Sequence, residues 1–169
     1  MTDGIEQAEW RRLQAQDIAG VTAVANIVHP DFFEDEAVFR DRFNIYPVGC
    51  FVLAKGSEIV GYGISHPWKL DSVPALNSIL SELPKDISTY YIHDIALLPE
   101  VRSGGQASRV VELMGAQAER DGFATMALVA VNGSQGFWEK KGFIARDVLA
   151  LEDKLKGYSD EAIYMARVG

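Results

Sequence analysis

One segment near the middle of the chain restricts the possible folds more than any other. Residues 90–98 are aromatic and β-branched and stop at Pro99, which predicts a strand. Residues 104–120 carry apolar side chains at every third or fourth position, which predicts a helix. The junction between the two contains Gly104 and Gly105. We therefore expect a strand and a helix joined by a short turn rich in glycine.

Shorter strand-like and helix-like segments alternate along the rest of the chain. Two β-rich runs around residues 55–57 predict a hairpin, and Asp17 is placed to cap the helix that follows it. Acidic residues 34–36 suit the first turn of a second helix. We expect strands over residues 10–13, 50–54, 58–65, 125–131, 143–151 and 162–168, helices over 18–28, 34–44 and 134–141, and one short helix within 70–88. This alternation predicts an α/β fold.

Length and composition set limits on the class of protein. The chain has 169 residues, of which 48 % are hydrophobic, so we expect a single domain over residues 1–169. It contains no apolar run of membrane-spanning length, and its first residues do not resemble a signal peptide. With one cysteine, Cys50, and three separated histidines, no disulfide and no structural metal site are expected. We expect a cytoplasmic protein.

The net charge narrows the choice of partners. A formal charge of -8 disfavours nucleic acid, because binding to phosphates needs clustered Lys and Arg. The same acidic surface would attract a cationic amine.

The junction after residue 98 has the features of a phosphate site. The first turn of a helix presents unpaired backbone N–H groups and the positive end of the helix dipole. Gly104 and Gly105 have no Cβ to keep an anion away from the backbone, and Arg102 adds a positive charge. On this segment alone, a plain strand-to-helix turn explains the glycines equally well. The segment is neither a Walker loop nor a dinucleotide fingerprint.

Two blocks in the right order make the interpretation specific. Arg102-x-x-Gly105-x-Ala107 resembles the Arg/Gln-x-x-Gly-x-Gly/Ala pattern of the GNAT superfamily of N-acetyltransferases, and residues 132–143, NGSQGFWEKKGF, resemble its second block. The resemblance covers nearly the whole chain. It implies the single-domain GNAT fold, with a central mixed, mostly antiparallel sheet flanked by helices.

The same resemblance implies a site for acetyl-CoA. The strand that ends at Leu97 would separate from its neighbour, and the backbone of Ala96 and Leu97 would pair with the pantetheine arm. The side chain of Asn132 would face the pantetheine or the thioester, with Trp138 in the same region. The pyrophosphate would be bound by the backbone amides of Arg102, Ser103, Gly104, Gly105, Gln106, Ala107 and Ser108.

Candidates for the proton transfers lie on the same strand. A general base should titrate near the working pH, which favours histidine, so His93 is the first candidate and Asp94 the second. A chain of water molecules is the third. By strand alternation we expect Tyr91, His93, Ile95 and Leu97 on one face and Ile92 and Asp94 on the other.

The sequence departs from the family at Trp138, where most members have a tyrosine that can protonate the leaving thiolate. An indole N–H cannot act as an acid near neutral pH. Solvent, Tyr62, Tyr91 or Tyr164 remain as sources of that proton. We interpret His29 as a residue at a helix end.

The sequence therefore predicts an acetyl-CoA-dependent N-acetyltransferase that acts on a primary amine of a small molecule or a protein. The alternative is a non-catalytic module that binds acyl-CoA. The identity of the acceptor and the oligomeric state, a homodimer included, are left open.

Overall fold

The computed structural model describes residues 7–168 and places seven strands in one sheet of order β1-β2-β3-β4-β5-β7-β6. All neighbouring strands are antiparallel except β4 and β5, which are parallel. The mixed, mostly antiparallel sheet confirms the predicted fold class. The strands are β1 (Glu9–Arg12), β2 (Cys50–Lys55), β3 (Glu58–Trp68), β4 (Thr89–Leu97), β5 (Thr125–Ala130), β6 (Ile144–Ala145) and β7 (Ile163–Val168).

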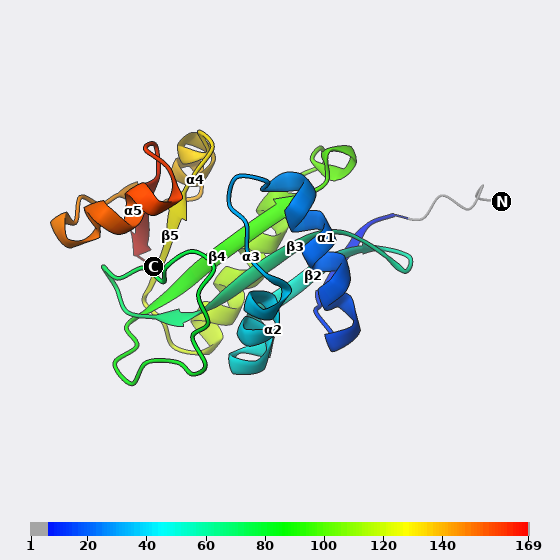
Figure 1. Cartoon of the computed structure of the whole chain (residues 1–169), viewed down its shortest axis with the longest axis horizontal. Helices are drawn as coiled ribbons and strands as arrows, with labels where there is room; N and C mark the ends of the chain where they lie inside the picture. The colour runs from blue at the N-terminus through cyan, green and yellow to red at the C-terminus, as the bar shows by residue number, and fades with distance from the viewer. Residues whose placement is uncertain (1–6, 169) are drawn as a thin grey trace.

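Helices cover both faces of the sheet. In Figure 1, α1 and α2 lie in front of β2 and β3, and α3 lies behind them. No helix within residues 7–168 is long and apolar enough to cross a membrane. The α-helices are α1 (Ile18–Val28), α2 (Glu36–Ile45), α3 (Gln106–Arg120), α4 (Gln135–Lys140) and α5 (Glu152–Tyr158).

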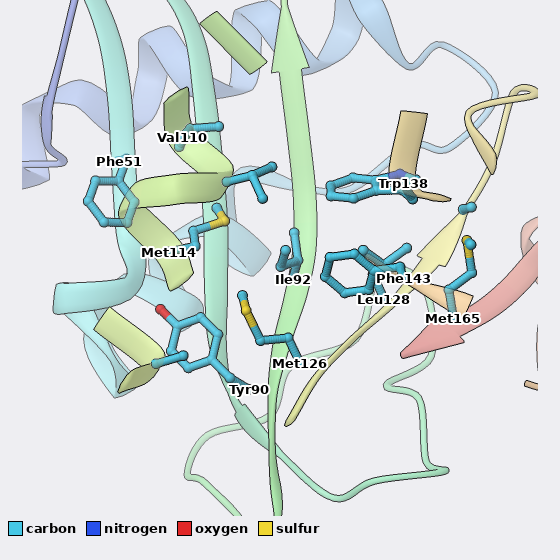
Figure 2. Packing of buried hydrophobic residues seen from close by; sticks show 13 residues of the cluster. Phe51, Tyr90, Ile92, Val110, Met114, Met126, Leu128, Trp138, Phe143 and Met165 are labelled. Carbon is cyan, nitrogen blue, oxygen red and sulfur yellow. The ribbon is translucent and has the colours of Figure 1, made fainter. Parts of the chain in front are cut away.

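The largest core lies between α3 and the sheet. Val110 and Met114 of α3 pack against Ile92 of β4 and Leu128 of β5, and Trp138 of α4 completes the cluster. Figure 2 shows these side chains pointing toward one another across the sheet face. A second core lies under α1 on the other face. The core thus fixes β4, β5, α3 and α4 relative to one another.

The strands β4 and β5 pair over only part of their lengths. Their register joins residues 90–92 of β4 to residues 126–128 of β5. Beyond this point β4 continues to Leu97 while β5 ends at Ala130, and the two strands diverge in Figure 1. A gap therefore opens between two central strands, where the resemblance placed the pantetheine arm.

A β-bulge lies at His93. In the register with β3, Ile64 is opposite Asp94 and Ser65 is opposite Ile92, so His93 is an extra residue in β4. A bulge interrupts the alternation of side chains. As a result, His93 and Asp94 both point toward the segment between α1 and α2.

The predicted division of β4 into two faces is therefore wrong. Ile95 and Leu97 pack on the α3 side with Ile92, whereas Tyr91 packs on the opposite side. Period-two alternation would hold only for a strand without an extra residue.

Two further expectations, a short helix within residues 70–88 and a strand over residues 143–151, need correction. Residues 69–88 contain no helix, because Asp71, Asn77 and Ser81 all adopt positive φ and interrupt any helical run. Of the strand expected over 143–151, only β6 forms, and the chain then enters α5, which the sequence analysis did not predict.

The second helix begins at Glu36 rather than Glu34. Glu34 lies before the helix, and its side chain turns inward instead of remaining in solvent near the helix dipole.

Candidate functional site

The start of α3 presents free backbone donors to solvent. The first backbone hydrogen bond into α3 runs from Arg109 N–H to Gly105 O at 3.0 Å, so the preceding helical amides have no acceptor within the helix. Gly104 and Gly105 have φ of 93° and 77°, and a Cβ built on either would meet no atom within 4 Å. Residues 102–105 are exposed. This arrangement is an anion site open to a ligand.

The β4 backbone beside the gap with β5 also has free groups. Leu98 N–H donates to Val60 O, so the backbone groups of Leu98 point toward β3. The backbone groups of Ala96, two residues earlier, point the same way. Leu97 and Ile95 then direct their backbone groups toward the gap, where the carbonyl oxygen of Leu97 already accepts from Arg102 Nε. Of the two residues predicted to pair with the pantetheine arm, Leu97 faces the gap and Ala96 faces β3.

Arg102 is anchored at the end of β4. Its Nε donates to the carbonyl oxygen of Leu97 at 3.0 Å. This bond holds the guanidinium group between the strand end and the exposed amides that follow it.

A cavity of about 270 Å³ occupies the gap between β4 and β5. Residues 92–95 form one wall, and residues at the end of β5 form another. Toward α3 and α4 the cavity is lined by Ala107, Asn132 and Trp138. On the opposite side, Phe32 and Tyr158 line it. The cavity thus connects the region of the predicted CoA site with the segment between α1 and α2.

Asn132 and Trp138 owe their positions to local structure. Asn132 follows β5 in a left-handed conformation with φ of 56°, which asparagine tolerates better than most residues. Trp138 lies edge-on between Phe137 and Phe143, and its indole is largely buried in the core, as Figure 2 shows for Trp138 and Phe143. The indole therefore has a packing role in addition to lining the cavity.

His93 forms a buried pair with Glu34. The distance from His93 Nε2 to Glu34 Oε1 is 2.7 Å, and the two side chains are 1 % and 5 % exposed. Burial opposes ionisation of Glu34, but the contact with His93 outweighs it and lowers the pKa of the carboxyl. Nε2–H therefore donates to a carboxylate. His93 Nδ1 is buried and has no hydrogen-bond partner within the described residues.

Asp94 forms a second imidazole–carboxylate contact, with His29, that is an ion-pair contact without hydrogen-bond geometry. His29 Nε2 lies 2.9 Å from Asp94 Oδ1, and the Tyr62 hydroxyl donates to Asp94 Oδ2. Burial alone would lower the pKa of His29, but the Asp94 carboxylate raises it above its usual value. The pKa of Asp94 is lowered, because His29 outweighs the effect of burial. The pair therefore consists of a carboxylate and a histidine that favours its protonated form.

The remaining candidates lie outside the cavity wall. Tyr91 is buried against Ala127 and Tyr164, and burial raises the pKa of its phenol well above the usual value. The His66 ring stacks near Tyr91 and His93, and burial lowers the pKa of His66 to about 3. Cys50 is buried, and burial raises its pKa to about 12, so it is no nucleophile.

Sequence reasoning missed three residues that reach the cavity, His29, Glu34 and Tyr158. His29 was interpreted as a helix-end residue, which it also is, since it follows α1 directly. No local pattern marks Glu34, because its partner lies 59 residues away. Tyr158 ends a helix that the sequence analysis did not predict.

The sequence matches the family described as Acetyltransferase (GNAT) over residues 13–143. The chain belongs to this family. The two blocks at residues 102–107 and 132–143 lie within the matched range, and Ala107, Asn132 and Trp138 from these blocks line the cavity. No match was found among curated protein sequences.

Solved structures of GNAT proteins share the fold of this GNAT chain. It is similar to Ard1 from Thermoplasma volcanium, with 17 % identity, 95 % of this chain and 97 % of that chain covered, and a TM-score of 0.73. It is also similar to a chain of the NatC complex bound to Gag peptide and CoA, with 17 % identity, 96 % and 99 % covered, and a TM-score of 0.71.

A third similar structure is the GphF GNAT-like decarboxylase in complex with isobutyryl-CoA, with 16 % identity, 95 % and 98 % covered, and a TM-score of 0.74. At such identities the likeness shows the fold alone. The chemistry of this GNAT protein must therefore be argued from its own site.

Proposed function

We propose that the protein transfers the acetyl group of acetyl-CoA to a primary amine. The observation that carries this proposal is the single cavity between β4 and β5. One end of it reaches the start of α3, and the other end holds two imidazole–carboxylate pairs. An acyl donor and an amine can therefore meet in one cavity beside groups that handle protons.

The residues present fit acetyl-CoA. The open amides at the start of α3 suit a pyrophosphate, and the backbone groups of Ile95 and the N–H of Leu97 suit an amide-containing arm. Acetyl-CoA supplies the acetyl thioester. A backbone N–H in the gap can stabilise negative charge that develops on the thioester oxygen.

His93 is our candidate for the group that accepts the proton of the ammonium. With Nε2–H donating to Glu34, the neutral ring has its lone pair on Nδ1. Nδ1 then receives the proton directly or through one water molecule. Glu34 holds the ring orientation and stabilises the imidazolium that forms.

Asp94 is the weaker candidate for a base. Its lowered pKa leaves it ionised at neutral pH and makes it a poor proton acceptor there. Its charge can instead attract the ammonium group of the acceptor.

Bond formation from the amine nitrogen to the carbonyl carbon breaks the C–S bond and releases a thiolate, which needs a proton. Trp138 cannot supply it. The Tyr62 hydroxyl donates to Asp94, and the Tyr158 hydroxyl donates to Pro74 O. Tyr91 and Tyr164 do not line the cavity. We assign this proton to water.

The test combines cofactor binding with turnover. CoA and acetyl-CoA should raise the melting temperature of the protein, and NAD and ATP should raise it less. A ligand stabilises the folded protein only to the extent that it binds the folded state. Release of free thiol from acetyl-CoA should then depend on an amine when a panel of amines is tested. CoA binding without any amine-dependent release would favour the non-catalytic alternative.

A further inference from the structure

We propose that the acceptor is a small primary monoamine with an apolar body and without a carboxylate near the amine. This inference rests on the proposed acetyl transfer and adds the class of its acceptor. It follows from the charge, the lining and the closure of the cavity on the side away from α3.

The cavity wall contains acidic groups and, within residues 7–168, no lysine or arginine. Glu34 and Asp94 both line it, and their partners are His93 and His29. Each of the two carboxylates lies beside one histidine, so this side of the cavity is negative whenever either histidine is neutral. A negative cavity attracts an ammonium group and repels a carboxylate.

Two cations near this side lie outside the cavity wall. Arg42 is completely buried, and its Nη1 donates to Asp41 Oδ2 at 2.8 Å and to Ser78 O at 2.9 Å, while its Nε and Nη2 have no hydrogen-bond partner within residues 7–168. Lys154 Nζ donates to Val73 O at 2.9 Å. Since neither side chain lines the cavity, an acceptor carboxylate there would form no direct ion pair with them.

The rest of the wall favours an apolar body. On the acceptor side, Phe32 and Leu76 line the cavity, and Val129 and Phe137 continue the apolar surface inward. The Tyr158 hydroxyl donates to Pro74 O at 2.8 Å, so it is already engaged with the protein. A second ammonium or several hydroxyl groups on the acceptor would lose water here without gaining partners.

The acceptor side is closed by loops that are bonded to one another. Asn77 N–H donates to Glu34 Oε2 at 3.0 Å, and Asp35 N–H donates to Asn77 Oδ1 at 2.8 Å. From the other flank, Lys154 and Tyr158 bond to carbonyls of residues 73 and 74. The segment of residues 70–88 is thus held on both sides. The cavity of about 270 Å³ must hold both the acetyl end of the donor and the acceptor. The remaining space fits a small molecule rather than a folded protein surface.

The experiment compares acceptors that differ in one group. With saturating acetyl-CoA, kcat/KM is measured for 2-phenylethylamine, L-phenylalanine, L-phenylalaninamide and a tripeptide with an N-terminal phenylalanine. We expect 2-phenylethylamine to exceed phenylalanine by roughly 100-fold or more, because an unpaired charge is costly to bury. Phenylalaninamide, which has the size of the amino acid but lacks its charge, should lie between them.

A substitution that adds a positive charge to the cavity wall tests the argument from charge. In Phe32→Arg, a cation lines the acceptor side, and the preference for 2-phenylethylamine over phenylalanine should fall by roughly 10-fold or more. Phe32→Leu should keep the wild-type order. A Phe32→Arg protein that binds CoA with an unaltered preference would contradict the argument from charge.

The outcomes separate this inference from the proposed function. Equal or better turnover of phenylalanine or the tripeptide would overturn the acceptor class while leaving acetyl transfer intact. CoA binding with no turnover of any amine would overturn acetyl transfer, and the acceptor class with it.

Discussion

Glu34 Oε1 and His93 Nε2 lie 2.7 Å apart although 59 residues separate them in the sequence. The β-bulge at His93 makes this contact possible, because it turns His93 and Asp94 to the same side of the sheet. The segment between α1 and α2 supplies the complementary partner of each. A histidine on the strand thus pairs with a glutamate on the segment, and an aspartate on the strand pairs with a histidine on the segment.

Replacement of His93 tests the assignment of the base. His93→Ala should lower turnover by roughly 100-fold or more, the usual scale for general acid–base catalysis. The affinity for acetyl-CoA should change little, since backbone groups bind most of that ligand. The acidic limb of the pH–rate profile should also disappear. Full activity with an unaltered profile would leave Asp94 or a water chain as the proton acceptor.

Substitutions of Glu34 test whether it orients the imidazole. Glu34→Gln keeps an oxygen that can accept from His93 Nε2–H, whereas Glu34→Ala removes it and leaves a buried donor unpaired. We therefore expect kcat to fall in the order wild type, Glu34→Gln, Glu34→Ala, with roughly 10-fold between the two variants. Equal kcat in both variants would mean that the acceptor oxygen does not position the ring.

Gly105 tests the pyrophosphate site. Gly105→Val should weaken CoA binding by roughly 10-fold or more, because its branched side chain would cover the backbone amides. This fold-change corresponds to the loss of one or more hydrogen bonds from those amides to the pyrophosphate. The left-handed φ also makes this variant strained by about 1–3 kcal/mol. Gly122→Val is the matched control, since Gly122 has φ of 83°, open space around it, and a place at the other end of α3. Titration calorimetry on both variants should show weak CoA binding only for Gly105→Val.

The His29–Asp94 pair predicts a pH-dependent contribution to stability. The pKa of His29 is raised in the folded state, so its stabilisation is fully present below the unfolded value near 6.5 and is lost as pH rises through the folded value. The free energy of unfolding of wild type minus that of His29→Gln should therefore be larger at pH 5.5 than at pH 9. Urea unfolding of both proteins at pH 5.5 and at pH 9 measures this difference in the free energy of unfolding. A difference that is the same at both would show that His29 gains nothing from Asp94.

Much of the frame around the site could be predicted from the sequence. Local patterns predicted the strand at residues 90–98, the helix that follows and the glycines between them, because short-range sequence features specify each of these elements. The same is true of the open amides at Gly104 and Gly105. The family blocks then placed Asn132 and Trp138 beside the cavity.

The acceptor side could not be predicted in the same way. Glu34 looked like an acidic residue of a helix start, and only the fold shows that it turns inward to His93. The bulge in β4 depends on pairing with β3, which no spacing in β4 alone reveals. The loop of residues 70–88 is held by bonds to distant segments rather than by secondary structure of its own.

One measurement tests the central claim most directly. The protein is incubated with acetyl-CoA labelled with ¹³C in the acetyl group and with 2-phenylethylamine, and both products are quantified by mass spectrometry. The account predicts one labelled N-acetyl amide for each free CoA released, with His93→Ala reducing both together. Release of CoA without labelled amide, or binding of acetyl-CoA with neither product, would contradict it.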